Sequence, residues 1–125
     1  MDCAMTYLPT FQYTDTDATF ALPSGTTEQD VVEILAGNSI IQIGAIFLDL
    51  VNLTQNATIR VYVRIDDTNY REIAGATFPW TTSDPDGVLA VSGITTDHDI
   101  KVTIQSSVAE GASRDIPYTA AYGEQ

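Results

Sequence analysis

The sequence predicts an all-β fold, a single-domain antiparallel β-sandwich or jelly-roll-like barrel of about 8 strands. The clearest observation is the alternation over residues 59–66, where apolar and polar side chains follow one another. The apolar set is Ile59, Val61, Val63 and Ile65, and the polar set is Arg60, Tyr62, Arg64 and Asp66. A period of two is typical of a strand with one face in a core. The second observation is that turn residues recur at the spacing of short paired strands.

Candidate strands follow one another along the whole chain. In order they are residues 6–13, 18–22, 30–35, 39–53, 57–66, 70–73, 87–91, 100–106 and 116–122. Turn-forming groups separate most of them, namely Pro23-Ser24-Gly25, Gly37-Asn38, Asp66-Asp67, residues 83–87, Ser92-Gly93 and Glu110-Gly111. Residues 28–35 also resemble one or two helical turns, because Val31, Val32 and Leu35 fall near helical spacing. We favour a strand there, since the window is short, rich in valine and soon followed by Gly37.

Residues 39–53 carry apolar side chains on both faces of the expected strand. One face has Ile41, Ile43, Ala45, Phe47, Val51 and Leu53, and the other has Ile40, Ile46, Leu48 and Leu50. Apolar residues on both faces indicate that both faces are shielded from water. Three explanations stay open: a β-bulge near Gly44 that exchanges the faces, cover by a terminal segment, or an interface between subunits.

The composition is that of one acidic domain. A chain of 125 residues can bury its own core without help from a metal or disulfide. Seventeen acidic residues stand against five basic ones, for a net charge of −12, and no basic residue precedes Arg60. We therefore expect no nucleic-acid partner and no anionic membrane surface, because both require clustered Lys and Arg. Such a charge favours solubility, and it is also typical of proteins from high salt.

The N-terminal residues bear on the compartment of synthesis. Cys3 is the only cysteine, so no disulfide can form within the chain. The segment MDCAMTYLPTF lacks the basic and apolar regions of a secretory signal. No apolar run approaches the roughly 18 residues of a membrane helix. We therefore expect synthesis in a reducing compartment and no membrane insertion.

Residues that commonly perform catalysis are sparse. His98, the only histidine, lies in the polar turn of residues 96–99, where exposure to solvent is more common than catalysis. There is no G-x-S-x-G motif, and one Cys and one His cannot provide the four ligands of structural zinc. The aspartate pairs at 15/17, 66/67, 84/86 and 97/99 are expected in turns, with Asp84 and Asp86 the better candidates for a weak calcium site. We expect no enzymatic activity, no metal site of any strength and no other cofactor.

Residues 52–73, NLTQNATIRVYVRIDDTNYREI, together with residues 101–107 and 109–118, resemble small β-sandwich proteins encoded among the virion genes of tailed viruses. The resemblance covers about half of the chain, and its motifs are structural rather than catalytic. It implies a capsid decoration protein or another accessory of the virion surface, present in many copies and made in the host cytoplasm. The implied partner is the major capsid protein or another virion protein.

We expect the chain to form a homo-oligomer, a trimer or a larger closed assembly. The expected contact residues are Ile40, Ile46, Leu48, Leu50, Arg60, Tyr62 and Arg64. Arg and Tyr are favoured in interfaces, although the last three could equally form a solvated strand face paired with the chain's own acids. Residues 1–13 are a candidate docking arm or, equally, a frayed end.

A carbohydrate-binding or adhesion module is the alternative function. Trp80, Tyr62 and Tyr70 are the aromatic residues that could stack on a sugar ring. Trp80 follows Phe78 and Pro79, however, and an aromatic residue in such a cluster more often fills a core or a sheet edge. A hydrolase ranks third, because no acid, base and nucleophile converge in the sequence.

Overall fold

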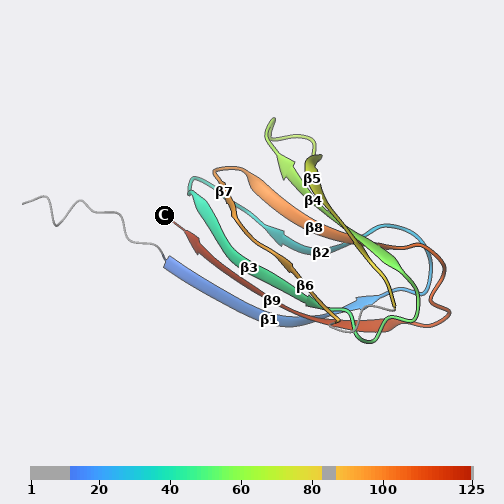
Figure 1. Cartoon of the computed structure of the whole chain (residues 1–125). Coiled ribbons are helices and arrows are strands. Elements are labelled where there is room, and N and C mark those ends of the chain that lie inside the picture. Colours follow the sequence, from blue (N-terminus) through green and yellow to red (C-terminus); the bar gives the residue numbers. More distant parts are fainter. Residues whose placement is uncertain (1–11, 83–86, 125) are drawn as a thin grey trace, which may run out of the picture.

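The computed structural model describes residues 12–82 and 87–124, which form two antiparallel β-sheets packed face to face (Figure 1). The strands are β1 (Gln12–Leu22), β2 (Gln29–Ile34), β3 (Ile41–Asp49), β4 (Ala57–Arg64), β5 (Arg71–Trp80), β6 (Val88–Val91), β7 (Ile94–Thr96), β8 (Asp99–Ser106) and β9 (Arg114–Glu124). The described residues contain no helix. The predicted all-β sandwich is therefore confirmed.

The strands are divided between the two sheets in the manner of a jelly roll. Sheet A has the order β1-β9-β3-β6, and β7 pairs with the first residues of β3. Sheet B has the order β2-β8-β4-β5. Because the chain crosses repeatedly from one sheet to the other, both layers fold together around one core.

A β-bulge in β3 explains the apolar residues on both faces of this segment. The pairing of β3 with β9 shifts register between Ile43 and Ala45, around Gly44. An extra residue in one strand reverses the direction in which the following side chains point. Ile41 and Ile43 before the bulge, and Ile46 and Leu48 after it, therefore all face the core.

This bulge overturns part of the predicted interface between subunits. Ile46, Leu48 and Leu50 each have 0% of their surface exposed, because they pack within the chain's own core. The prediction that these three residues contact another subunit is wrong. Ile40, by contrast, lies outside β3 and is 44% exposed.

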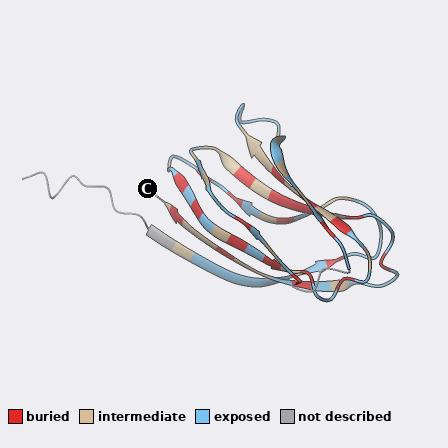
Figure 2. Ribbon diagram, in the orientation of Figure 1, coloured by how far each residue is buried: buried red, intermediate tan, exposed pale blue. Residues whose placement is uncertain are grey.

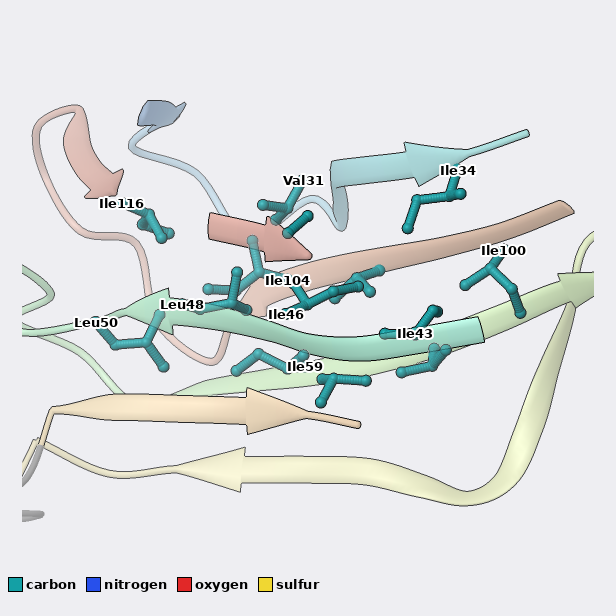
Figure 3. Close-up of a cluster of buried hydrophobic side chains, with 14 of the residues drawn as sticks. Val31, Ile34, Ile43, Ile46, Leu48, Leu50, Ile59, Ile100, Ile104 and Ile116 are labelled. Carbon is teal, nitrogen blue, oxygen red and sulfur yellow. The ribbon is translucent and has the colours of Figure 1, made fainter. Parts of the chain in front are cut away.

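The core lies between the inner faces of the two sheets (Figure 2, Figure 3). Sheet A contributes Leu22, Ile41, Ile43, Ile46, Leu48, Val91, Ile116 and Ala120, and sheet B contributes Val31, Ile34, Ala57, Ile59, Val61, Trp80, Ile100, Val102 and Ile104. The stretch of buried aliphatic residues is continuous from one sheet to the other in Figure 3. Burial of this apolar surface is the main force that stabilises the sandwich.

Several strand boundaries differ from the predicted ones, for local reasons. Asp15 and Asp17 were expected in a turn but lie within β1. An edge strand can expose polar side chains on both faces, so it tolerates these aspartates. β5 continues to Trp80, past Gly75 and Pro79, whereas the predicted strand ended at residue 73. The expected strand at 6–13 lies almost wholly outside the described residues. The strand at 30–35, favoured over a helix, is confirmed by β2.

Glu110 connects the loops at one end of the sandwich through hydrogen bonds. Its side chain is fully buried and accepts hydrogen bonds from the backbone N–H groups of Thr54 and Gln55, at 3.0 and 2.9 Å, and from the Thr54 hydroxyl. Arg114 donates to the same carboxylate at 3.1 Å. Burial alone would raise the pKa of Glu110, but these hydrogen bonds lower it below its ordinary value of 4.5.

We expect Leu48→Ala to lower the free energy of unfolding by about 2–5 kcal/mol, because it leaves a cavity in the core. The neighbouring Phe47→Ala removes a larger side chain but should cost only about 1 kcal/mol or less, since Phe47 points outward. Urea denaturation followed by circular dichroism measures both. Equal losses for the two variants would mean that the direction of these side chains is misassigned.

We expect Glu110→Gln to lower the free energy of unfolding by about 2 kcal/mol at pH 7, because hydrogen bonds to a charged acceptor are lost. The lowered pKa of Glu110 means that its stabilisation is fully present above pH 4.5 and is lost as the pH falls through the folded-state pKa. The difference between wild type and variant should therefore shrink in acid. Asp115→Asn, an exposed change of equal charge, is the control. A pH-independent difference would contradict this account.

Candidate functional site

A shallow, open hollow on the outer face of sheet A is the best candidate for a binding site. Its volume is about 490 Å³ and it extends across four adjacent strands. The lining residues are Asp17, Ala18 and Thr19 of β1, Pro117, Tyr118 and Thr119 of β9, Phe47 and Asp49 of β3, and Val88 of β6. Phe47 and Val88 are 44% and 52% exposed, so large apolar surface faces solvent here.

The strand register explains why these side chains gather. Thr119 of β9 lies opposite Asp17 on one side and Phe47 on the other, and Asp49 lies opposite Val88. The pairing of β9 with β3 ends at Tyr118, next to Pro117, whose backbone has no N–H to donate. The ladder therefore stops beside the hollow.

The outer face of sheet A is acidic. Asp15, Asp17 and Asp49 lie on its strands, and Thr119 donates a hydrogen bond to Asp15 at 3.1 Å. Arg114 is the only basic residue in the sheet A strands, and it pairs with Glu110. An apolar floor with an acidic rim suits a neutral or cationic apolar partner better than an anionic one.

The outer face of sheet B is different, because four of the five basic residues lie on its strands: Arg60, Arg64, Arg71 and Lys101. Arg60 donates to Gln105 at 2.9 Å and lies 3.9 Å from Glu28 and 3.7 Å from Glu72. Lys101 lies 3.2 Å from Asp30. These cations are therefore largely neutralised by carboxylates of their own chain.

Two tyrosines belong to the same network on sheet B. The Tyr62 hydroxyl donates to Glu28 and the Tyr70 hydroxyl to Glu33, both at 2.6 Å. The Lys101 ammonium lies 5.2 Å from the centre of the Tyr62 ring and 4.7 Å from that of Tyr70. Burial and the Glu28 carboxylate raise the pKa of Tyr62 to about 12, so its hydroxyl stays protonated at neutral pH.

The Arg60, Tyr62 and Arg64 stripe therefore has partners within the chain. Arg64 pairs with Asp99, which also accepts a hydrogen bond from the Ala36 backbone at 2.7 Å. The sequence left open whether this stripe contacts a neighbour or the chain's own acids, and the intramolecular contacts are present. Contact with an acidic neighbour stays a prediction, as it does for the exposed Ile40.

The aromatic residues named for sugar stacking are poorly placed for it. Trp80 is 5% exposed and belongs to the core, as its position after Phe78 and Pro79 suggested. Both tyrosine rings have a cation close by, and the Arg64 guanidinium also lies 5.1 Å from the centre of the Tyr70 ring. The prediction of Trp80 as a sugar platform is wrong.

The residues considered for catalysis and metal binding do not form a site within the described part of the chain. The Nε2 atom of His98 lies 3.3 Å from the Asp97 carboxylate, and no described hydroxyl or thiol donates to this imidazole. Residues 12–82 and 87–124 contain no group of three or more metal-binding side chains. Asp84 and Asp86, the weak calcium candidates, lie outside the described residues. None of the described elements is a helix able to cross a membrane.

The sequence reasoning missed the hollow on sheet A. Its main apolar residues, Phe47 and Val88, were assigned to strands but not to a binding surface. The available signal was Gly44: a bulge there places Phe47 and Asp49 on the outer face together. Val88 and Pro117 could not be added from sequence, because they reach this face only through long-range pairing.

Comparison with known proteins supports the fold. No family model matches the sequence, and no curated protein matches it. The structure resembles a protein of Bacillus endospore appendages, which are disulfide-linked pili, with a TM-score of 0.54 and 16% identity over 91% of this chain and 90% of that chain. It also resembles the Yersinia pseudotuberculosis-derived mitogen, with a TM-score of 0.45 and 13% identity over 86% and 84% of the two chains. At these identities the likeness to the appendage protein extends to the fold alone.

Proposed function

We propose that this protein is a non-enzymatic structural subunit that associates with copies of itself through the outer face of sheet A. The observation that carries the proposal is the apolar hollow across β1, β9, β3 and β6, with Phe47 and Val88 exposed. Exposed apolar patches of this kind often mark protein contacts. Sheet B is the weaker candidate surface, because its charged groups would have to leave their present partners or be desolvated with them.

Charge shapes how such an assembly forms. Each chain has a net charge of −12, and the proposed contact face has an acidic rim. Copies therefore repel one another at low ionic strength, and salt reduces this repulsion. The apolar contact is insensitive to screening, so association should strengthen as salt is added.

The absence of an assembled catalytic set among the described residues agrees with a structural role. Within residues 12–82 and 87–124, His98 has an aspartate beside it but no hydroxyl that donates to its ring. The buried carboxylate of Glu110 is committed to loop backbone and to Arg114, which accounts for its burial without any reaction. We propose a trimer or larger assembly, with the virion surface as its location, following the resemblance to virion proteins of tailed viruses. Co-purification with virus particles, lost on Phe47→Ser, tests that location.

Assembly into a fibre is a related form of the same role. The Bacillus appendage protein of similar fold forms disulfide-linked pili. The chain described here has one cysteine, so disulfides could join its copies only in pairs. The association that we propose is therefore noncovalent.

We expect sedimentation velocity to show oligomers of the wild type whose fraction rises between about 20 and 500 mM NaCl, because salt screens the acidic faces. Phe47→Ser should shift the protein towards monomer by about tenfold in dissociation constant, since an apolar contact is lost. Ile65→Ser alters another exposed apolar residue, in the β4–β5 turn away from the hollow, and is the matched control. A wild type that stays monomeric at every salt concentration would refute the proposed role.

A glycan-binding module is a second candidate, favoured by the exposed Phe47 ring and the carboxylates in the same hollow. Phe47 could contact a sugar ring, while Asp17 and Asp49 could accept hydrogen bonds from its hydroxyl groups. On a glycan array we would then expect binding that is lost in both Phe47→Ser and Asp17→Asn but retained in Ile65→Ser. No binding by the wild type, or binding unaffected by Phe47→Ser, would exclude this candidate site.

A further inference from the structure

We infer that the hollow on sheet A binds an extended segment of another protein in which one apolar side chain lies between two basic ones. This partner goes beyond the proposed self-association, because it uses the same hollow but needs no second copy of the chain. The proposed contacts are Phe47 and Pro117 with the apolar side chain, and Asp17 and Asp49 with the two cations.

Phe47 and Val88 differ from the other exposed large apolar residues in the described part of the chain, because they alone lie on strands. The others lie outside the strands and are Leu35, Ile40, Val51, Ile65 and Val108. Single apolar residues in loops are common on protein surfaces, whereas apolar side chains gathered in one patch indicate a contact. β1, β9, β3 and β6 lie side by side, so the hollow lies on paired strands rather than on loops (Figure 1).

The carboxylates of the hollow lack cationic partners. Neither Asp17 nor Asp49 forms an ion pair with any residue in 12–82 or 87–124. One oxygen of Asp49 accepts a hydrogen bond from the Val51 backbone N–H at 3.1 Å, which holds this carboxylate in place on the strand. A partner that brings cations therefore gains an electrostatic attraction here that a neutral or acidic partner does not.

The spacing of the two carboxylates suits a particular pattern of side chains. Asp17 lies opposite Thr119 of β9, and Thr119 lies opposite Phe47 of β3. Asp49 is two residues further along β3. With strands about 4.8 Å apart and a rise of about 3.4 Å per residue, the two aspartates are separated by about 12 Å. Pro117 lies between them.

An extended segment matches this arrangement. Its first, third and fifth side chains point the same way, and the first and fifth lie about 13 Å apart. Basic residues at the first and fifth positions would then reach the two carboxylates. An apolar residue at the third position would lie over Pro117 and against Phe47.

A second copy of this chain is a poorer source of such cations. Four of its five basic residues form ion pairs within the chain, namely Arg60, Arg64, Lys101 and Arg114. The fifth, Arg71, interacts electrostatically with Asp66. Docking any of them would break an existing attraction to gain a new one. The predicted docking arm, residues 1–13, lies almost wholly outside the described residues and is not needed for this contact. Copies that meet through Phe47 would compete with the basic segment.

An NMR titration of 15N-labelled full-length protein with the peptide acetyl-TKTLTKT-amide tests this inference. At about 20 mM NaCl, where copies of the acidic chain repel one another most, we expect saturable shifts of the amides around the hollow. The control peptide acetyl-TTKLKTT-amide has the same composition, but as an extended segment it directs both lysines away from the face of its leucine. It should bind about tenfold more weakly.

Two variants separate the apolar and the charged contributions. Phe47→Ser and the double variant Asp17→Asn/Asp49→Asn should each weaken peptide binding about tenfold. The control Asp67→Asn/Asp97→Asn removes the same charge from two exposed turns and should change binding less than twofold. Raising NaCl to about 500 mM should weaken peptide binding, whereas it should strengthen the proposed self-association.

Four results would overturn the inference: no saturable shift up to about 5 mM peptide, equal binding of the two peptides, shifts confined to sheet B, or equal effects of the two double variants. If copies associate and Phe47→Ser separates them, but the peptide does not bind, the proposed function stands and the basic partner does not. If the protein is monomeric at every salt concentration and binds the peptide at the hollow, the partner stands and self-association does not.

Discussion

The packing of β3 against sheet B is the interaction on which this sandwich is built, and one extra residue in β3 makes it possible. The bulge between Ile43 and Ala45 lets both halves of the strand direct their large aliphatic side chains inward. Without it, one half would expose isoleucine and leucine to water while leaving a gap in the core. The same shift turns Phe47 outward, so the device that completes the core also creates the apolar part of the outer face.

The two outer faces differ in whether their charged side chains have partners of opposite charge. On sheet B, arginine and lysine side chains lie among carboxylates and tyrosine hydroxyls. They form ion pairs and hydrogen bonds within the chain. On sheet A, the carboxylates of Asp15, Asp17 and Asp49 have no basic residue of the same face to balance them. The molecule therefore presents one internally neutralised face and one acidic face with an apolar hollow. This asymmetry is the main reason to place contacts on sheet A.

The position of the hollow beside β1 connects surface chemistry with strand pairing. β1 is a long and regular edge strand, and natural proteins usually interrupt, shorten or cover such edges. Its aspartates discourage pairing between two copies of β1 without blocking the backbone groups. The edge and the hollow are nevertheless separate surfaces, because the hollow extends from β1 over β9, β3 and β6, on the side away from the free edge.

The sequence by itself determined the fold class, because alternation of apolar and polar residues is a local property of each strand. It also placed Ile59, Val61 and Val63 on the inward face, but Ile65, assigned to the same face, is 62% exposed in the turn after β4. For Trp80 it left a core or edge position and a sugar-binding position open, and the structure buries this residue in the core. It could not choose between a bulge and an interface for Ile46 and Leu48, since that choice depends on how β3 pairs with β9. The candidate site was beyond its reach for the same reason. Phe47, Val88 and Pro117 are far apart in the chain, and only the pairing of β3, β6 and β9 brings them to one surface.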